Sequence, residues 1–250
     1  KDSQEFYNLN ISGSVNLELN GAVKAWKFQL SDEARGYTST YTTELTGSGS
    51  LAAEEIVLTK CSSLSDASNS ACLVLNADLT SNKKIKTENG VSIEIKSGKT
   101  LKAASLVHET SQSTPFSEIR VYGTLDVTDA ASAGDGTIPL SEKSGGSGGI
   151  KLSVFSGGSV KSKKITVQGN FSNGSDSAVI SNAGTIEVSD EISIKSDGSG
   201  SENVLELLDG FQLSGSGTLK LDSSILKYSG TSAASSDFSV ELLGNTGKPV

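Results

Sequence analysis

A short phrase recurs along this chain of 250 residues and limits what it can fold into. Each close copy consists of glycine, threonine and an aliphatic–polar–aliphatic triplet. Alternation with a period of two residues places one face of a strand on a core and the other face in solvent, and glycine suits the turns between such strands. The close copies are GTLDV at 123–127, GTIEV at 184–188 and GTLKL at 217–221, and looser copies begin at Gly13, Gly90, Gly98, Gly148 and Gly157.

The composition raises intrinsic disorder as an alternative. The chain has 45 serines and 19 threonines, and only 5% of its residues are aromatic. Hydroxyl-rich, acidic chains often cannot bury enough apolar surface to offset the entropy of ordering. Here, however, Leu, Ile and Val are gathered into short alternating runs. We therefore predict many short strands that share a thin aliphatic core.

The charge excludes two classes of partner. A net charge of −8 provides no electrostatic footprint for nucleic acid or for an anionic membrane surface. We interpret the basic clusters at 83–84 and 161–164 as solvated edges that discourage pairing between sheets. No run approaches the roughly 18 apolar residues of a membrane helix. We predict neither nucleic-acid binding nor direct membrane insertion by this segment.

The spacing of the strands favours a coil over a sandwich. The segment TIEVSDEISI at 185–194 alternates, breaks at 189–191 and alternates again, as in a chain that turns a corner within one coil. Sandwich strands recur about every 8–12 residues around a larger core. In a coil, equivalent side chains of successive turns would form aliphatic columns. The sequence predicts an all-β parallel β-helix of about ten coils, with about 4.8 Å between strands.

Two stretches interrupt this rhythm, and we expect both to be protruding loops. They are 61–72, which is bounded by cysteines, and 128–149, which is rich in glycine and serine. Residues 1–45 also differ, because six of the thirteen aromatic residues lie among the first 41. We predict N-terminal coils or a cap at 1–45, and a β-helix continuous with it at 46–250.

Cys61 and Cys72 are the only cysteines. A metal site would need more ligands, and the single histidine, His108, lies far from them in the sequence. We interpret the pair as a disulfide that closes a small hairpin, with two unrelated thiols in a loop as the alternative. Such a closure would stabilise the fold by about 2–3 kcal/mol and would imply an oxidising compartment, hence export.

The phrases at 123–127, 184–188 and 217–221, the N-x-G turn in SNAGTIEV at 181–188 and the closely spaced cysteines resemble the passenger region of bacterial autotransporter adhesins. Over residues 45–243 the chain is similar to the right-handed parallel β-helix family that includes filamentous haemagglutinin-like secreted proteins. The resemblance implies a right-handed coil with protruding loops. It also implies display at the bacterial outer membrane, cell adhesion and a role in virulence.

Catalytic signals are weak. Hydrolysis by two carboxylates needs both in one cleft, whereas Asp126, Glu187 and Asp222 occupy outward positions of separate strands. The segment GGSGG at 145–149 matches the nucleophile motif G-x-S-x-G, but that motif needs a strand before it and a helix after it. A pair of Ser147 with His108 is therefore not expected to be catalytic. We assign no catalytic residue and no cofactor site.

Calcium is the remaining chemistry to weigh. Oxygen ligands occur in the segments 66–69, 129–136 and 196–203. None follows the EF-hand spacing or the calcium-binding repeat of β-helices. We interpret them as solvated turns and assign no metal ligand.

The sequence thus predicts a secreted or surface-displayed adhesin without enzymatic activity. Its expected partners are a receptor or glycan on host or bacterial cells, with self-association as an additional contact. Two alternatives stay open. One is a polysaccharide-degrading or polysaccharide-binding β-helix protein, and the other is a purely structural stalk or self-associating matrix protein.

Overall fold

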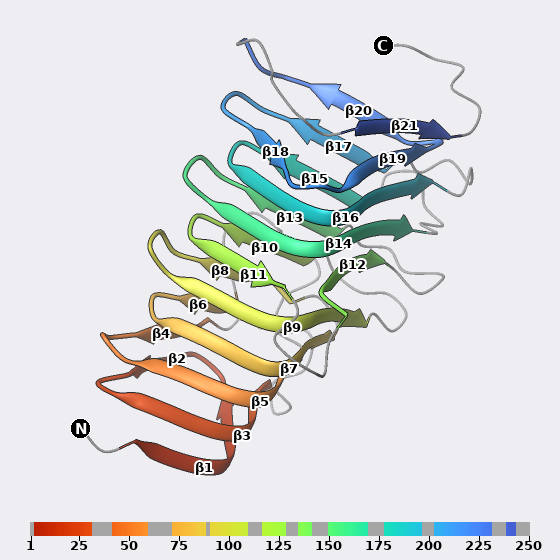
Figure 1. Ribbon diagram of the computed structural model, residues 1–250. Coiled ribbons are helices and arrows are strands. Elements are labelled where there is room, and N and C mark those ends of the chain that lie inside the picture. Colours follow the sequence, from red (N-terminus) through yellow and green to blue (C-terminus); the bar gives the residue numbers. More distant parts are fainter. Residues whose placement is uncertain are drawn as a thin grey trace.

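The computed structural model describes residues 3–31, 42–59, 72–88, 91–109, 117–128, 135–141, 150–169, 178–196, 203–231 and 239–243. Every regular element in these ranges is a β-strand (Figure 1), which confirms the predicted all-β class. No helix long and apolar enough to cross a membrane occurs in them.

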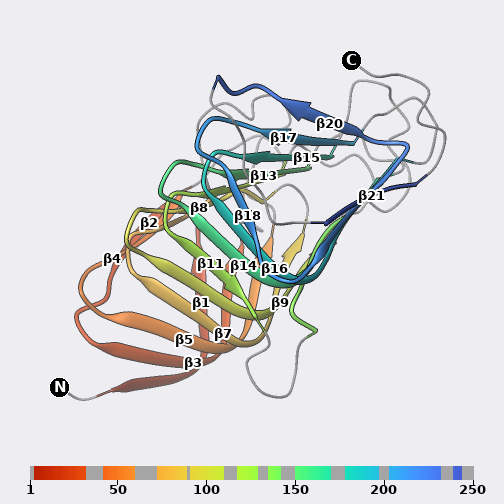
Figure 2. The same ribbon diagram turned by 45° about the horizontal axis from the view of Figure 1, so that its top comes forward.

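The strands form two sheets (Figure 1, Figure 2). Sheet A contains β1 (Gln4–Ser12), β3 (Ala22–Ser31), β5 (Ser50–Thr59), β7 (Asp78–Glu88), β9 (Thr100–Glu109), β11 (Thr124–Val127), β12 (Thr137–Ser141), β14 (Ser159–Gly169), β16 (Thr185–Ser196), β18 (Gln212–Ser214), β19 (Thr218–Asp222) and β21 (Ser239–Leu243). Sheet B contains β2 (Val15–Glu18), β4 (Thr43–Thr46), β6 (Leu73–Leu75), β8 (Ile93–Ile95), β10 (Ser117–Val121), β13 (Ile150–Val154), β15 (Ala178–Asn182), β17 (Val204–Leu207) and β20 (Ile225–Tyr228).

All pairings between described strands are parallel. The chain alternates between the sheets, so that each sheet gains its strands in sequence order. Two positions of sheet A are divided between short strands, β11 with β12 and β18 with β19. Parallel pairing throughout differs from the antiparallel pairing of a β-sandwich.

In-register pairing stacks equivalent side chains into columns. Leu51, Leu79, Leu101 and Leu125 are successive partners in sheet A, and all four are buried. Complete burial of one such side chain contributes about 1.5–3 kcal/mol. The predicted aliphatic columns are therefore confirmed. The sheet A column continues through Val160, Ile186 and Leu213, and one column of sheet B comprises Leu73, Ile93, Ile119, Leu152, Ile180 and Leu205.

The turns from sheet B to sheet A explain the glycine of the repeated phrase. A Cβ on Gly123, Gly158 or Gly184 would come within 2.2–2.4 Å of a backbone oxygen of a neighbouring turn. Only glycine allows the backbones to approach this closely. The next residue then starts the sheet A strand, and the amide of Thr185 donates to the carbonyl of Gly158 at 3.0 Å.

The two edges of the structure differ in the length of their connections. Between the described strands, eight connections from sheet B to sheet A contain two to four residues, and the last one, before β21, contains ten, whereas those from sheet A to sheet B contain two to 13. The sheet B to sheet A connections are 19–21, 47–49, 76–77, 96–99, 122–123, 155–158, 183–184, 208–211 and 229–238. The sheet A to sheet B connections are 13–14, 32–42, 60–72, 89–92, 110–116, 142–149, 170–177, 197–203 and 223–224.

Part of the predicted loop at 128–149 is wrong. Within it, β12 pairs with β14 in sheet A, and Ile138 and Leu140 are buried in the core. The short alternation TIPL at 137–140 encodes this strand, and the glycine and serine around it conceal the pattern. The parts at 129–134 and 142–149 lie outside the described residues, as does most of the second predicted loop, 61–72.

The first part of the chain joins the same sheets. Strands β1, β2 and β3 pair in parallel with the strands that follow them. The boundary expected between residues 45 and 46 lies inside β4. In the described part of 1–45, the strands are thus layers of one continuous core.

Candidate functional site

The strands of sheet A contain a corner at which neighbouring residues point outward together. In β3, the buried residues Ala25 and Phe28 enclose Trp26 and Lys27. The register shifts near the corresponding place in the β5–β7, β7–β9 and β14–β16 pairings. Such irregularities bend a strand and redirect its side chains. The corner therefore collects outward side chains from successive strands.

Near the N-terminal end, this corner carries a group that we call the corner cluster. It combines exposed aromatic side chains from β1 and β3 with acids from β5 and lysines from β7. Its members are Tyr7, Trp26, Glu54, Glu55, Lys83 and Lys84.

The aromatic part of the corner cluster is open to solvent. Tyr7 is 77% exposed and Trp26 is 50% exposed. Their rings are stacked, with centroids 6.5 Å apart and planes 4° apart. The Nζ of Lys83 lies 4.8 Å from the centroid of the Trp26 ring, which is a cation–π distance. Trp26 is the single tryptophan of the chain, and tryptophan and tyrosine are enriched at binding interfaces.

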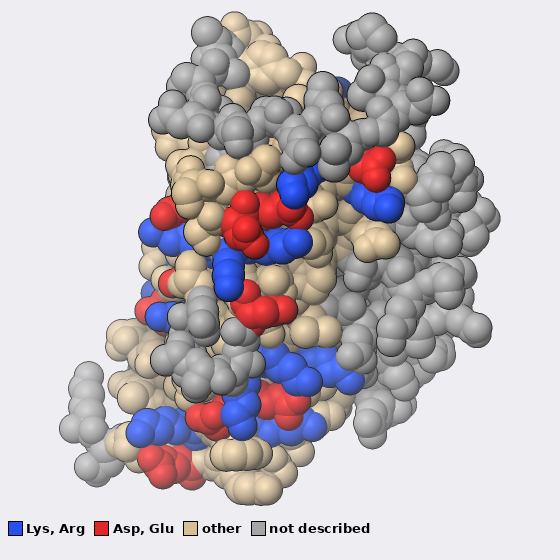
Figure 3. All heavy atoms as spheres, turned by 45° about the vertical axis from the view of Figure 1, so that its right-hand side comes forward, with Lys and Arg blue, Asp and Glu red and all other residues tan. Residues whose placement is uncertain are grey.

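A hollow of about 360 Å³ adjoins this stack, lined by Trp26 and the four charged members of the corner cluster. Glu54, which lines the hollow, accepts a hydrogen bond of 2.7 Å at Oε1 from Asn82 Nδ2. Glu55 is the register partner of both Lys27 and Lys84, so opposite charges alternate. Figure 3 shows the same interleaving of basic and acidic side chains across this side of the molecule. The hollow thus offers an aromatic wall, two carboxylate acceptors and two ammonium donors.

Elsewhere on the outer face of sheet A the charges form ion pairs. Glu191 receives Lys164 and Lys220 from the two adjacent strands, each at 2.8 Å. Hydrogen bonds from these lysines hold the pKa of the Glu191 carboxyl below its usual value. Because each carboxylate oxygen of Glu191 pairs with a lysine of a different neighbouring strand, this residue links three strands of sheet A.

The outer face of sheet B has a more buried network. Arg120 donates to Glu118 at 2.8 Å and lies 3.7 Å from Glu94, and its side chain is only 13% exposed. The hydroxyl of Ser153 donates to the second oxygen of Glu118 at 2.7 Å. Glu94 also pairs with Lys96, and that hydrogen bond raises the pKa of the lysine. The basic side chains of Arg120 and Lys96 neutralise both carboxylates. This network therefore fits a role in stabilising the sheet.

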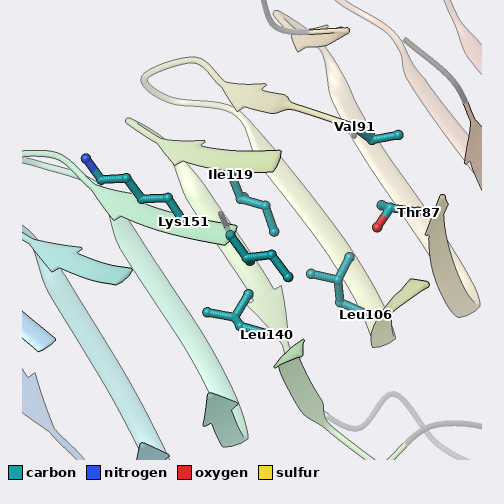
Figure 4. Close-up of a pocket in the computed structure, with 7 residues that line it drawn as sticks. Thr87, Val91, Leu106, Ile119, Leu140 and Lys151 are labelled. Atoms are coloured by element: carbon teal, nitrogen blue, oxygen red, sulfur yellow. The ribbon is translucent and has the colours of Figure 1, made fainter. Parts of the chain in front are cut away.

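A cavity inside the core lies beside β12 (Figure 4). Its volume of about 10 Å³ accommodates no more than one water molecule. Apolar side chains from both sheets line it, and the ammonium group of Lys151 points away from it (Figure 4). It is too small for a substrate. The lining residues are Thr87, Val91, Leu106, Ile119, Leu140, Ile150 and Lys151.

The predicted disulfide is described at one end only. Cys72 is fully buried and takes part in a disulfide, and its Sγ accepts a hydrogen bond from the amide of Ser92 at 3.2 Å. Cys61 lies outside the described residues. The pairing of Cys61 with Cys72 stays a prediction.

The residues weighed for catalysis do not form a described pair. The backbone of His108 is in β9, where its register partner is Thr87, and Ser147 lies outside the described residues. Sheet A does bring Asp126 and Glu187 into one column, but Lys161 stands between them. Lys161 pairs with Glu187 at 3.3 Å. Asp222 belongs to another column and faces Lys195 at 3.8 Å.

Two of the segments weighed for calcium are partly described. Asp135 accepts hydrogen bonds from the amide and hydroxyl of Thr137 at 3.1 and 2.6 Å. Asn203 is buried, and it donates to the carbonyl of Lys195 at 2.6 Å and accepts from the amide of Ala178 at 3.0 Å. The side-chain oxygens of Asp135 and Asn203 thus accept hydrogen bonds from backbone amides. In the described ranges, no group of three or more His, Cys, Asp or Glu side chains could hold a metal ion.

Comparison of the chain with protein-family profiles, with curated protein sequences and with solved structures found no match. The corner cluster is not predicted from the sequence. The available signal is the slip of phase in AVKAWKFQL at 22–30, where buried Ala25 and Phe28 are three positions apart. Such a slip places two consecutive side chains outward, and one of them is the only tryptophan.

Proposed function

We propose that the chain is a right-handed parallel β-helix from an exported protein, and that it acts as a non-catalytic adhesive rod at a bacterial cell surface. The alternation of strands between two parallel sheets supports the β-helix. The winding of the chain in Figure 1 supports the right-handed sense, which is also the sense expected of crossovers between parallel strands. The resemblance to autotransporter passengers supports the setting.

The difference between the two edges carries the adhesive part of the proposal. Short turns at one edge are held by close backbone contacts at Gly123, Gly158 and Gly184. Apart from 128–136 within sheet A and 229–238 before the last strand, the connections of seven or more residues begin where sheet A strands end and finish where sheet B strands begin. A scaffold that keeps one edge constant and varies the other concentrates sequence variation where recognition is usually located. We therefore assign host-cell or bacterial receptors to this second edge.

The core supports a mechanical role for the same scaffold. Its columns of Leu, Ile and Val run through successive layers of both sheets. Ion pairs across adjacent strands, such as Glu206 with Lys227 at 2.7 Å, add to the outer faces. These contacts fix each layer to the next. A rod that holds its contact surface away from a membrane needs such stiffness.

A second candidate, self-association as a stalk or matrix protein, is favoured by a separate observation. In the described residues, the exposed large hydrophobic side chains lie in strands next to the two ends of the stack. Apolar groups at both ends and an unpaired edge at β1 favour contact between copies. The side chains are Phe6, Tyr7, Val15, Trp26, Leu226 and Tyr228.

Cell binding tests the adhesin directly. The 250-residue chain, fluorescently labelled, is incubated with epithelial cells and with bacterial cells, alongside cells stripped of glycans. We expect saturable binding to one surface, and a loss of binding when the connection 60–72 or 142–149 is replaced by a two-residue turn. Light scattering over a range of concentrations runs in parallel. Absence of binding together with concentration-dependent oligomers would favour the second candidate, and absence of both would exclude each of them.

A further inference from the structure

We propose that the hollow beside Trp26 binds a neutral saccharide, with one face of a pyranose ring against the indole and its hydroxyls on the charged groups of the corner cluster. The inference deepens the proposed function, on which it rests for its biological setting, because it makes a glycan the ligand of the rod.

The aromatic wall is the first step. Tyr7 comes from β1 and stacks on Trp26 from the side of the N-terminal end, whereas Lys83 comes from β7 and approaches from the side of the hollow. Trp26 is thus braced on one face, and only a flexible lysine head lies over the other. An apolar C–H face of a sugar ring fits such a surface, and the displaced ammonium group remains within reach of the sugar oxygens.

The charges select the class of saccharide. Glu54 and Glu55 balance Lys83 and Lys84, so the lining of the hollow has no net charge. The chain as a whole has a net charge of −8, which repels anionic ligands at long range. Hydroxyl groups both donate and accept, so each can lie between a carboxylate and an ammonium group. A neutral sugar satisfies this lining better than a sialylated or sulfated one.

The size and openness of the hollow set the expected affinity. A volume of about 360 Å³ is at the lower end of the range for ligand sites, about 300–1,000 Å³, which suits a short saccharide. Because the site lies on an outer face and Trp26 is half exposed, a single saccharide is expected to bind with a dissociation constant of roughly 1 mM, about −4 kcal/mol.

The experiment uses the single tryptophan as its probe. Because the chain has no other tryptophan, its fluorescence reports on this hollow alone. The 250-residue protein is titrated with methyl β-galactopyranoside, methyl α-mannopyranoside and N-acetylglucosamine, and with N-acetylneuraminic acid as the anionic comparison. We expect a saturable change in emission with at least one neutral sugar. No change with any of them at about 100 mM, or tighter binding of the anionic sugar, would overturn the assignment.

Two variants of the corner cluster and one control variant test the residues. Glu54→Gln removes one carboxylate and is expected to weaken binding about tenfold, whereas Glu187→Gln, on the same outer face in β16, is expected to leave it unchanged. Trp26→Phe, measured by calorimetry, is expected to retain weak binding. Circular dichroism and thermal melting verify that each variant is folded. Equal affinity of Glu54→Gln and the unaltered protein would contradict the role given to the corner cluster.

Failure of the two proposals is distinguishable. Saturable cell binding that persists in Trp26→Phe and is not inhibited by any neutral sugar would overturn the saccharide site and leave the adhesin in place. Saccharide binding in the titration without binding to any cell would do the reverse.

Discussion

The edge with short turns and the edge with long connections are built on different principles. At the short edge, glycines such as Gly158 and Gly184 let one turn lie directly on the next, with a hypothetical Cβ only 2.2–2.4 Å from a backbone oxygen. At the other edge, connections range from two to 13 residues while the strands on either side keep their register. The short edge depends on close contacts between the backbones of successive turns. The long edge requires only that each connection brings the chain into register with the next strand of sheet B.

This contrast separates stability from function. A side chain cannot be added at Gly123, Gly158 or Gly184 without moving the layer beside it, so these turns have little freedom to acquire binding residues. The long edge can change in length and sequence at low cost, because the entropy of closing a loop grows slowly with its length. The corner of sheet A is intermediate. Its inward residues, such as Ala25, belong to the core, and its outward ones, such as Trp26, contact only other outer-face side chains and are partly exposed.

The largest expected effect of a point substitution comes from adding a methyl group at a closely packed turn of the short edge. We expect Gly184→Ala to lower the free energy of unfolding by about 2–4 kcal/mol, because its Cβ would lie 2.4 Å from the carbonyl oxygen of Gly158. Gly21→Ala is the matched control, since no atom lies within 4 Å of a Cβ there. Urea unfolding followed by circular dichroism measures both variants. Equal stability of the two would show that the turns do not stack closely.

Loss of the disulfide should have a slightly smaller effect at the long edge. Replacement of Cys61 by serine together with Cys72→Ala is expected to lower the free energy of unfolding by about 2–3 kcal/mol, because closure of the loop constrains the unfolded chain. Dithiothreitol should destabilise the unaltered protein by a similar amount and leave the double variant unchanged. Detection of two reactive thiols per denatured, unreduced chain would refute the pairing.

The sequence predicts the layers better than it predicts the corner. The glycine–threonine phrase at 184–188 is read correctly, because both the glycine turn and the period of two have direct physical causes. The segment 185–194 was expected to break into two strands at 189–191, yet β16 continues through it, with Val188 and Ile192 both buried. The predicted break is a bend within one strand. In the sequence it is visible only as an interruption of the apolar–polar alternation between Val188 and Ile192.

Contacts between distant segments explain the other failure. The alternation TIPL at 137–140 is only four residues long and stands among glycine and serine, so it is a weak strand signal by itself. It becomes a strand because β14 offers a partner and the core has space for Ile138 and Leu140. The corner cluster is likewise assembled from β1, β3, β5 and β7, which are far apart in the sequence. A single sequence does not show that these strands are neighbours.

A matched insertion compares the two edges directly. Four residues, Gly-Ser-Gly-Ser, placed between Gly146 and Ser147 at the long edge are expected to cost only about 0.6 kcal/mol or less. The same insertion between Ala183 and Gly184 should greatly destabilise the fold, because it separates two stacked turns. Thermal melting of the two variants measures the difference. Equal tolerance at both sites would remove the distinction between the edges.

The smallest expected effect concerns the outer face of sheet A, which neither edge constrains. Lys164 and Lys220 hold the pKa of Glu191 below its usual value in the folded chain. The contribution of this carboxylate is therefore fully present above the pKa of the unfolded chain, and it is lost as the pH falls through the lower, folded pKa. We expect Glu191→Gln to reduce stability at pH 7 by less than about 1 kcal/mol and to have less effect near pH 3.

Glu187→Gln is the control for this measurement, because Glu187 has one lysine partner at 3.3 Å and its side chain is half exposed. Urea unfolding of both variants at the two pH values isolates the contribution of Glu191. If the loss in Glu191→Gln were the same at pH 3 as at pH 7, the ionised form would not be what stabilises the sheet. The lower stability of Glu191→Gln would then come from a poorer fit of the amide side chain. The outer face of sheet A would in that case be constrained by packing, as the short edge is.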